Sequence, residues 1–583
     1  SGQFFASGAT AATDNTFAFA PIRHIPGRTS SADTHWNNLG PRVAAAWQVP
    51  FKNKIFGDKQ TVIRGGYAIL WSRTNGVTEA LIPLLGDGLA SAQFCNGPTS
   101  NGTSTASCSG ANINATNGFR LGVDGSTVPV PAAANAPIPL IPGSTFTAKS
   151  SGFDPSSAIP YSHNVTLDVQ RAFAHNWLVD VGYIGRFAKN LWQNVDAQAA
   201  DLYAKDPKSG QTLAQAYNAV NAAVNAGVNP YLPKNTTTCL TATSCINPAF
   251  PQQPFFENAP YGCPNCTNAI AFADGGDASL ATFMLNNYDS IAPRPLDPLQ
   301  LTNNNITTSG GIAHYNAMFA TVRKSMSQGL DLSFNYTWSH AVGTAGLNFL
   351  GQQYTAYSPA TPFDIFSGWG SNNGDRRHVI NASWLYELPF GRGKRFASNG
   401  ILNRVLGGWY SSGIWSWATG RPVCIGADGD YGAPNGFTCT VGATFFGKAS
   451  GRHGVAGSSG VGTNGDPATG GTGINIFADP AAVFNALRAP LPGVDGRPNA
   501  EALNEPRTWN VDLSVGKNIL ATERFRMVFT AEFFNAFNHP LFGTDTSNTG
   551  SVSLDLADAS GFGVVSKADN NPRTIQLGLR FEF

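Results

Sequence analysis

The end of the chain alternates between apolar and polar side chains up to its last residue. One parity is wholly apolar (Ile575, Leu577, Leu579, Phe581 and Phe583), and the other is polar or small (Gln576, Gly578, Arg580 and Glu582). Side chains alternate between the two faces of a β-strand. A soluble sheet with one wet face gives the same pattern, but here the apolar face ends in aromatic residues at the chain end. The segment therefore favours a strand that faces lipid.

The preceding segment, 523–538, repeats this pattern. One face is apolar (Phe525, Met527, Phe529, Ala531, Phe533 and Phe537), and the other carries Arg524, Arg526, Thr530, Glu532 and Asn538 beside Val528 and Phe534. Burying arginine and glutamate side chains in the core of a soluble sandwich would be costly. Placing them in a water-filled lumen, with the phenylalanines in lipid, costs little.

The sequence narrows the ways in which this chain could cross a membrane. No apolar run reaches the roughly 18 residues that a membrane helix needs. Because every backbone polar group in lipid must be paired internally, a closed β-barrel is the remaining solution. Charged residues make up 13% of the chain, about half the usual globular share. The net charge of +1 gives no electrostatic case for a nucleic-acid partner.

The predicted strands are joined alternately by short and long connections. About twelve strands are expected, at 12–22, 40–50, 60–71, 161–174, 176–188, 311–324, 328–342, 376–390, 403–420, 507–520, 523–538 and 573–583. The longest connections are 72–160, 189–310 and 421–505, with helices expected at 212–226 and 480–488. If Phe583 ends in the periplasm, every long connection falls outside the cell, as in outer-membrane barrels. The sequence thus predicts an all-β, transmembrane, antiparallel up-and-down β-barrel with long extracellular loops.

All eight cysteines fall in these long connections, as groups of two, four and two (Cys95 and Cys108; Cys239, Cys245, Cys263 and Cys266; Cys424 and Cys439). Even numbers in separate loops favour local disulfides made in an oxidising compartment. The expected bridges are Cys95–Cys108 and Cys424–Cys439. In the middle group, Cys239–Cys245 with Cys263–Cys266 is the simplest of three pairings. A zinc site at these four cysteines ranks lower, and the CPNC sequence lacks the strand-to-helix context of a redox motif.

The sequence holds no constellation that supports catalysis, and no cofactor or metal site is predicted. It lacks HExxH, GxSxG and Walker A sequences, and its Asp-Gly turns lack the acidic repeat of a calcium loop. Aromatic residues near predicted strand ends are candidates for the belts that flank a bilayer. These are Tyr336, Trp338, Trp384, Trp415, Trp417 and Phe581.

Several short stretches carry a family pattern. They are NNLGPRV at 37–43, TVIRGGY at 61–67, YNA at 315–317, DRRHVIN at 375–381, LPFGRGK at 388–394, GGW at 407–409 and EFFNAFNH at 532–539. Together they resemble the barrel part of Oar-like TonB-dependent receptors, from about residue 35 to 583. The last strand also resembles the C-terminal strand of outer-membrane barrels, and Leu579, Phe581 and Phe583 match the signal that the barrel-insertion machinery reads.

The resemblance implies a bacterial outer-membrane receptor. Its loops would bind an external ligand, and a TonB-type protein would supply the energy for transport. In that family a regulatory-like domain and a plug precede a barrel of 22 or more strands. Neither matches this chain, so we expect residues 1–583 to form one barrel domain, as part of a larger barrel or as a shortened one. The alternatives are a surface structural or adhesive barrel and a barrel involved in protein export.

Overall fold

The computed structural model describes most of the predicted strands and part of the connections. The described residues are 38–72, 95–96, 107–108, 150–153, 158–196, 203, 205–232, 245–258, 267–268, 304–344, 369–372, 374–396, 400–422, 449–453, 460–487, 503–520, 525–543, 552–556 and 558–583. The strand expected at 12–22 lies outside them.

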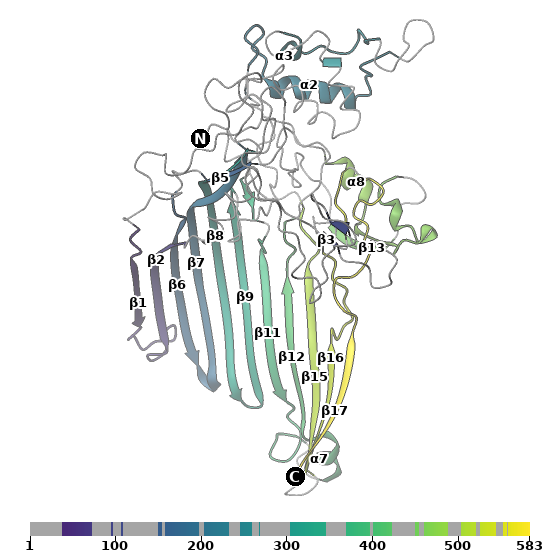
Figure 1. Ribbon diagram of the computed structural model, residues 1–583. Coiled ribbons are helices and arrows are strands. Elements are labelled where there is room, and N and C mark those ends of the chain that lie inside the picture. Colours follow the sequence, from purple (N-terminus) through teal and green to yellow (C-terminus); the bar gives the residue numbers. More distant parts are fainter. Residues whose placement is uncertain are drawn as a thin grey trace.

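One large antiparallel sheet dominates the structure. Its main path follows the chain in order through β1 (Arg42–Gln48), β2 (Thr61–Trp71), β6 (Tyr161–Phe173), β7 (Trp177–Asp196), β8 (Asn304–Ser327), β9 (Leu330–Gly343), β11 (His378–Glu387), β12 (Trp409–Ala418), β15 (Thr508–Leu520), β16 (Arg526–Phe534) and β17 (Thr574–Glu582). Figure 1 shows these strands side by side as one curved wall. The predicted all-β, up-and-down antiparallel fold is confirmed. Among the described residues, β1 pairs only with β2 and β17 only with β16, so both edges are open.

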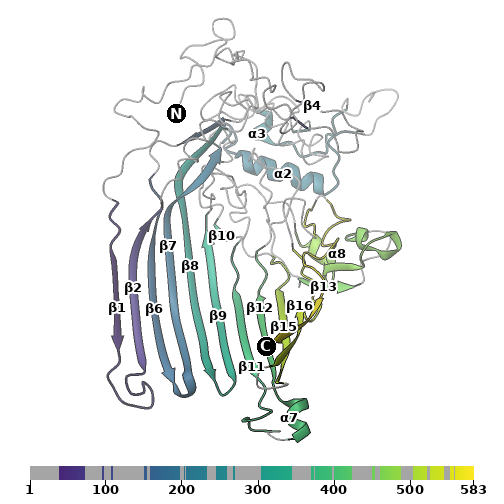
Figure 2. The ribbon, with the colours of Figure 1, turned by 60° about the horizontal axis from the view of Figure 1, so that its bottom comes forward.

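Short and long connections lie at opposite ends of this wall. Both views show α2 (Leu213–Asn225), α3 (Pro254–Glu257) and α8 (Pro480–Asn485), which belong to long connections, beyond one end of the wall (Figures 1 and 2). Figure 1 shows the C-terminus at the other end. We term these the long-loop end and the short-turn end. The described parts of the long connections form four small strand pairings. β3 (Cys95–Asn96) pairs with β4 (Ser107–Cys108), β5 (Ser150–Phe153) with β8, β10 (Gly370–Ser371) with β9, and β13 (Ala449–His453) with β14 (Ile474–Phe477).

The turn between β8 and β9 shows how the sequence produces a tight hairpin. Gln328 and Gly329 have φ angles of 55° and 80°. Positive φ at both central residues is the mark of a type I′ turn, whose twist matches that of the flanking strands. Gly329 is also required by space, because an added Cβ would lie 2.9 Å from the carbonyl oxygen of Glu387 on β11.

The predicted boundaries of four strands were wrong. The strand expected at 403–420 begins at Trp409, because α7 (Gly400–Leu406) occupies the preceding residues. β16 ends at Phe534, because Asn535 adopts a left-handed φ angle of 49° and the chain turns at this residue. β7 and β8 run beyond their predicted ends, because their pairing continues to Asp196 and Asn305 past a bulge. The helices expected at 212–226 and 480–488 are present as α2 and α8.

The strand register sorts side chains into two faces across the sheet. Directly opposed residues share a face, so a row of successive partners shows what one face carries. One row is Trp47, Ile63, Val169, Val181, Ala320, Tyr336, Ile380, Trp417 and Trp509. The next row, on the opposite face, is Val62, Gln170, Asp180, Thr321, Asn335, Asn381, Ser416 and Asn510. We term these the apolar face and the polar face.

Among the described residues, no buried core covers the apolar face. Leu167 on β6 and Leu577 on β17 are 53% and 68% exposed. The fully buried side chains instead gather in the long connections. Leu213 and Val220 of α2 and Phe255 and Phe256 of α3 are buried, and the two helices are in contact. A separate hydrophobic cluster is formed by Ile476, Phe477, Val483, Leu487, Leu503, Val552, Leu554, Phe562 and Val565. An exposed apolar surface of this extent needs a non-aqueous neighbour.

Candidate functional site

The polar face carries an ion-pair network across three neighbouring strands. Arg64 Nε on β2 lies 3.0 Å from Asp168 Oδ1 on β6, and Arg64 Nη2 lies 3.8 Å from Asp180 Oδ2 on β7. At the other edge of the sheet, Arg526 Nη1 lies 3.6 Å from Glu582 Oε2. These charges are partly exposed, so this face is suited to water.

A cavity of about 410 Å³ opens on the polar face near the long-loop ends of β15–β17. Asp512 Oδ1 accepts hydrogen bonds from Asn510 Nδ2 (3.0 Å) and from the backbone N–H of Asn535 (2.8 Å). Asn535 also holds the following turn, because its side chain bonds both the backbone N–H and the carbonyl oxygen of His539. The EFFNAFNH stretch therefore forms a rigid turn, built around a buried asparagine, beside this cavity.

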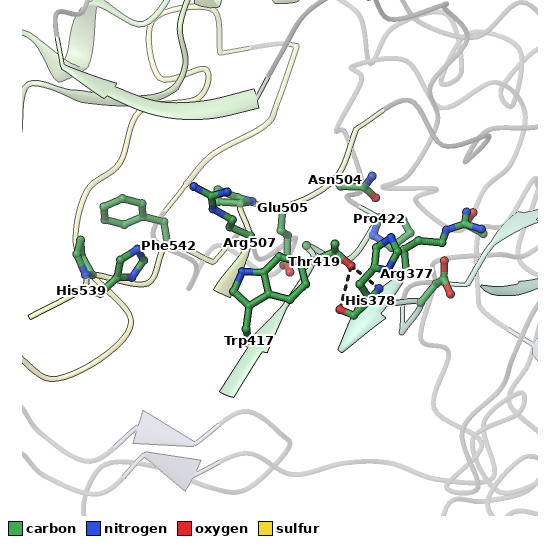
Figure 3. A pocket seen from close by; sticks show the side chains of 15 residues that line it. Arg377, His378, Trp417, Thr419, Pro422, Asn504, Glu505, Arg507, His539 and Phe542 are labelled. Carbon is green, nitrogen blue, oxygen red and sulfur yellow. Dashed lines mark hydrogen bonds between the residues drawn. The ribbon is translucent and has the colours of Figure 1, made fainter. Parts of the chain in front are cut away.

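A larger cavity, of about 850 Å³, lies at the long-loop ends of β11, β12 and β15 (Figure 3). We term it the rim pocket. It is lined by Ser371, Asp375, Arg377, His378, Trp417, Thr419, Gly420, Pro422, Asn504, Glu505, Pro506, Arg507, His539, Pro540 and Phe542. Figure 3 shows Trp417 at its centre, with Arg507, His539 and Phe542 on one side and His378, Arg377 and Pro422 on the other. Thr419 closes the wall here, because its Oγ1 accepts from the backbone N–H of His378 (3.0 Å).

Strand alternation places the rim pocket on the apolar-face side of the sheet. Trp417 and Trp509 are direct partners in the apolar row. His378 stands two residues before Ile380 of the same row, and Arg507 two residues before Trp509. Residues two apart on a strand share a face. The rim pocket therefore lies at the edge of the apolar face, on the opposite side of the wall from the Asp512 cavity.

Both carboxylates of the rim pocket are already engaged. Glu505 accepts two hydrogen bonds from Arg421, at 2.9 and 2.8 Å. Asp375 Oδ2 lies 2.9 Å from His340 Nδ1, and its Oδ1 accepts from the backbone N–H of Ala341 (2.7 Å). Such charge-assisted pairs are the stronger hydrogen bonds of a protein.

Positive groups outnumber these two carboxylates. Arg376 donates to the carbonyl oxygen of Thr419 (2.9 Å), and burial, followed by the charge of Arg421, lowers the pKa of Arg376. Burial and the neighbouring Arg507 likewise lower the pKa of His539. Among the described residues, no hydrogen bond or ion pair joins the Arg507 side chain to another residue. The lining contains Arg377 and Arg507, and Arg376 and Arg421 lie in contact with lining residues. This excess of arginine over the two carboxylates favours an anion.

The predicted girdle residues occupy different depths of the apolar face. Trp338 and Trp417 lie towards the long-loop end, Trp384 and Trp415 lie further along the strands, and Phe581 lies at the short-turn end. Tyr336 stacks on His378, with ring centroids 6.1 Å apart. Leu579 and Phe581 oppose Phe529 and Met527, and Phe583 packs near Phe525. The girdle and the insertion signal stay predictions.

The cysteines lie largely outside the described residues. The backbone pairs Cys95 of β3 (Cys95–Asn96) with Cys108 of β4 (Ser107–Cys108). Cys245 is described, whereas Cys239, Cys263, Cys266, Cys424 and Cys439 are not. No group of three potential metal ligands occurs among the described residues. Within the same part of the chain, no helix is long and apolar enough to span a membrane.

Sequence reasoning missed the rim pocket. It treated Arg376 and His378 as part of a family motif and His539 as the end of another, without a shared site. The available signal was that both motifs flank predicted strand ends, but only the three-dimensional register brings them together.

A family model described as an outer membrane beta barrel domain matches residues 3–576 of the chain. No curated protein matches significantly. Among solved structures, the chain is similar to the outer membrane transporter YddB of Escherichia coli, with 8% identity and a TM-score of 0.34 over 94% of this chain and 40% of that one. It is also similar to the ferric yersiniabactin uptake receptor FyuA of Yersinia pestis, with 8% identity and a TM-score of 0.30 over 93% of this chain and 37% of that one. The chain thus spans about two fifths of these proteins.

Proposed function

The chain belongs to the family of outer-membrane β-barrel domains, and from that premise we propose that it forms the wall of a receptor for an external solute. The long connections bind the solute at the cell surface, and the barrel passes it across the outer membrane with TonB-coupled energy. In this arrangement the apolar face contacts lipid, the polar face lines the passage, and the long-loop end faces outwards.

The observation that carries this proposal is the division between the two faces. The polar row runs without interruption from Gln170 on β6 through Asp180 to Asn510 on β15, and the Arg64 ion pairs lie beside it. A purely structural wall needs no such lining. The Asp512 cavity adds a polar recess on the same side, close to where a solute enters.

Energy coupling rests on the family motifs, such as DRRHVIN at 375–381 and EFFNAFNH at 532–539. These motifs resemble Oar-like TonB-dependent receptors, so the partners proposed are a TonB-type protein and the barrel-insertion machinery. The Leu579, Phe581 and Phe583 ending is the segment that the insertion machinery would read. The aromatic residues of the apolar face would mark the bilayer boundaries.

Uptake can be tested without knowing the solute. The gene is deleted in its host, and the loss of each compound from the growth medium is profiled over time. We expect one class of compound to remain in the medium of the deletion strain, and also in wild-type medium after a protonophore collapses the proton gradient. Equal depletion by both strains would contradict a role in uptake.

A second candidate is a surface adhesive barrel. The observation that favours it is that the connections between the strands contain buried apolar side chains, at Phe255 and in the cluster that residues 476–503 and 552–565 form around Phe562. Loops with folded cores are suited to presenting a stable binding surface. Loss of surface attachment in the deletion strain, with unchanged depletion of the medium, would select this function.

A further inference from the structure

We infer that the rim pocket binds the phosphate group of an outer-leaflet glycolipid. The site lies on the lipid side of the wall, apart from the solute passage. The inference rests on the outer-membrane family of the chain and on the proposed outward direction of the long-loop end. It does not depend on transport.

Position is the first support. The pocket continues the apolar face, because His378, Trp417 and Arg507 belong to the side that holds Ile380 and Trp509. The apolar side chains of that face contact the lipid tails, so a pocket at its outer edge lies at the level of the headgroups. A solute inside the passage is separated from it by the wall.

Aromatic residues mark the same level. Trp509 lies 4.2 Å from His539, and Tyr336 stacks on His378, measured between ring centroids. Further along the sheet, Trp71 of β2 lies 4.7 Å from Tyr161 of β6, and Phe187 of β7 lies 5.5 Å from His314 of β8, also between ring centroids. All of these strand residues belong to the apolar-face parity at the long-loop end. Amphipathic rings prefer the headgroup region of a bilayer.

Charge is the second support. Glu505 and Asp375 are held by Arg421 and His340, so neither carboxylate is available to neutralise Arg507. The Arg507 guanidinium remains at the pocket, next to His539 and with Arg377 also in the lining. Guanidinium groups bind phosphate oxygens in a bidentate manner, and basic pockets at membrane level bind lipid headgroups.

Size and shape agree with this ligand. About 850 Å³ accommodates a phosphorylated sugar. Trp417 offers an apolar ring for the sugar, while Asn504 and Thr419 offer polar groups at the edge. A simple inorganic anion would leave most of the cavity unfilled.

Binding is tested on the full-length protein in neutral detergent, by titration calorimetry. The probes are diphosphoryl lipid A, the same lipid with both phosphates removed, and inorganic phosphate. We expect the phosphorylated lipid to bind, and the dephosphorylated lipid and inorganic phosphate to bind at least tenfold more weakly. Arg507→Gln should lower the affinity for the phosphorylated lipid roughly tenfold, which corresponds to the loss of one charge-assisted hydrogen bond. Combining it with Arg377→Gln should weaken binding further.

The matched control is Arg392→Gln, which removes an exposed arginine from the short-turn end and should leave binding unchanged. Heat-modifiability on gels confirms that each variant is folded. Equal affinity of the wild type and the Arg507→Gln variant for the phosphorylated lipid would overturn the inference. So would a loss of affinity in Arg392→Gln as large as that in Arg507→Gln. Equally tight binding of inorganic phosphate would show a free-anion site instead. Because solute depletion is measured separately, failure of this inference leaves the proposed uptake function untouched.

Discussion

Introducing arginine at adjacent positions on opposite faces should have opposite consequences. Leu167 and Thr166 are neighbours at the middle of β6 (Tyr161–Phe173), and both are exposed. Leu167 lies on the apolar face between Gly65 and Tyr183, whereas Thr166 lies on the polar face between Gly66 and Ile184. The two positions therefore match in depth, strand and exposure, and they differ in the face and in the native side chain.

The expected magnitude follows from the depth of these residues. Arginine on the lipid face near the bilayer midplane costs about 2–4 kcal/mol, whereas lumen substitutions are mild. At about 1.4 kcal/mol per factor of ten, Leu167→Arg should shift the balance between assembled and unassembled barrel by roughly 30- to 700-fold. Thr166→Arg should leave the balance nearly unchanged, because the added charge stands in water and Asp168 lies two residues further along the same face.

The assay is the fraction of full-length protein that reaches the heat-modifiable form in the outer membrane, measured at equal expression. A small folded fraction for Leu167→Arg with a normal one for Thr166→Arg is the expected result. Equal assembly of the two variants, or a defect confined to Thr166→Arg, would refute the assignment of the two faces.

Four further predictions address other parts of the chain. Phe529→Arg or Phe533→Arg should impair assembly in the same assay. Arg526→Gln should not, because Arg526 lies on the polar face, where it donates to Asn518 and pairs with Glu582; equal defects would contradict this. Asn535→Ala should destabilise the turn after β16 by about 3 kcal/mol, because the side-chain hydrogen bonds are lost and alanine disfavours the left-handed φ. Asn535→Gly should recover the part of this cost that comes from the left-handed φ. Local hydrogen exchange measures both variants. Burial raises the pKa of Asp206, but hydrogen bonds from Ser209, Asn258 and Lys208 outweigh it and lower that pKa from 3.8 to about 2. The protection of α2 against hydrogen exchange should therefore be complete above pH 4 and fall as the pH drops towards 2. Protection that does not change with pH would argue against these bonds. Non-reducing peptide mapping should find Cys95 joined to Cys108 and Cys424 joined to Cys439. Each bridge should stabilise its loop by about 3 kcal/mol. Free thiols at these positions would contradict the prediction.

The sheet could be predicted from the sequence because alternation is a local property. Each strand shows its two faces without knowledge of its partners, as the segment from Ile575 to Phe583 does. Strand ends were harder to place. At Asn535 a left-handed residue ends the strand although the apolar pattern continues to Phe537. At Gly400–Leu406 the apolar residues form a short helix, and Gly408 (φ 78°) ends it where an added Cβ would meet the carbonyl oxygen of Asn518.

The rim pocket could not be predicted, because it depends on long-range register. Its lining comes from residues as far apart as Ser371 and Phe542, joined by strand pairs such as Trp417–Trp509. The sequence shows the arginines but not that Glu505 is used by Arg421 and Asp375 by His340. The uneven balance of charge appears only when those pairs are known.

The division of the wall into a lipid-facing and a water-facing side can be measured directly along β17. Nitroxide labels are placed one at a time at residues 574–582 of the full-length protein in bilayers, through a ketone-bearing amino acid that leaves the native cysteines untouched. Collision rates with oxygen, which concentrates in lipid, and with a water-soluble nickel complex are compared at each position. The account predicts high oxygen access at Ile575, Leu577, Leu579 and Phe581, and high nickel access at Gln576, Gly578 and Arg580. A profile without a two-residue period, or one with the opposite phase, would contradict it.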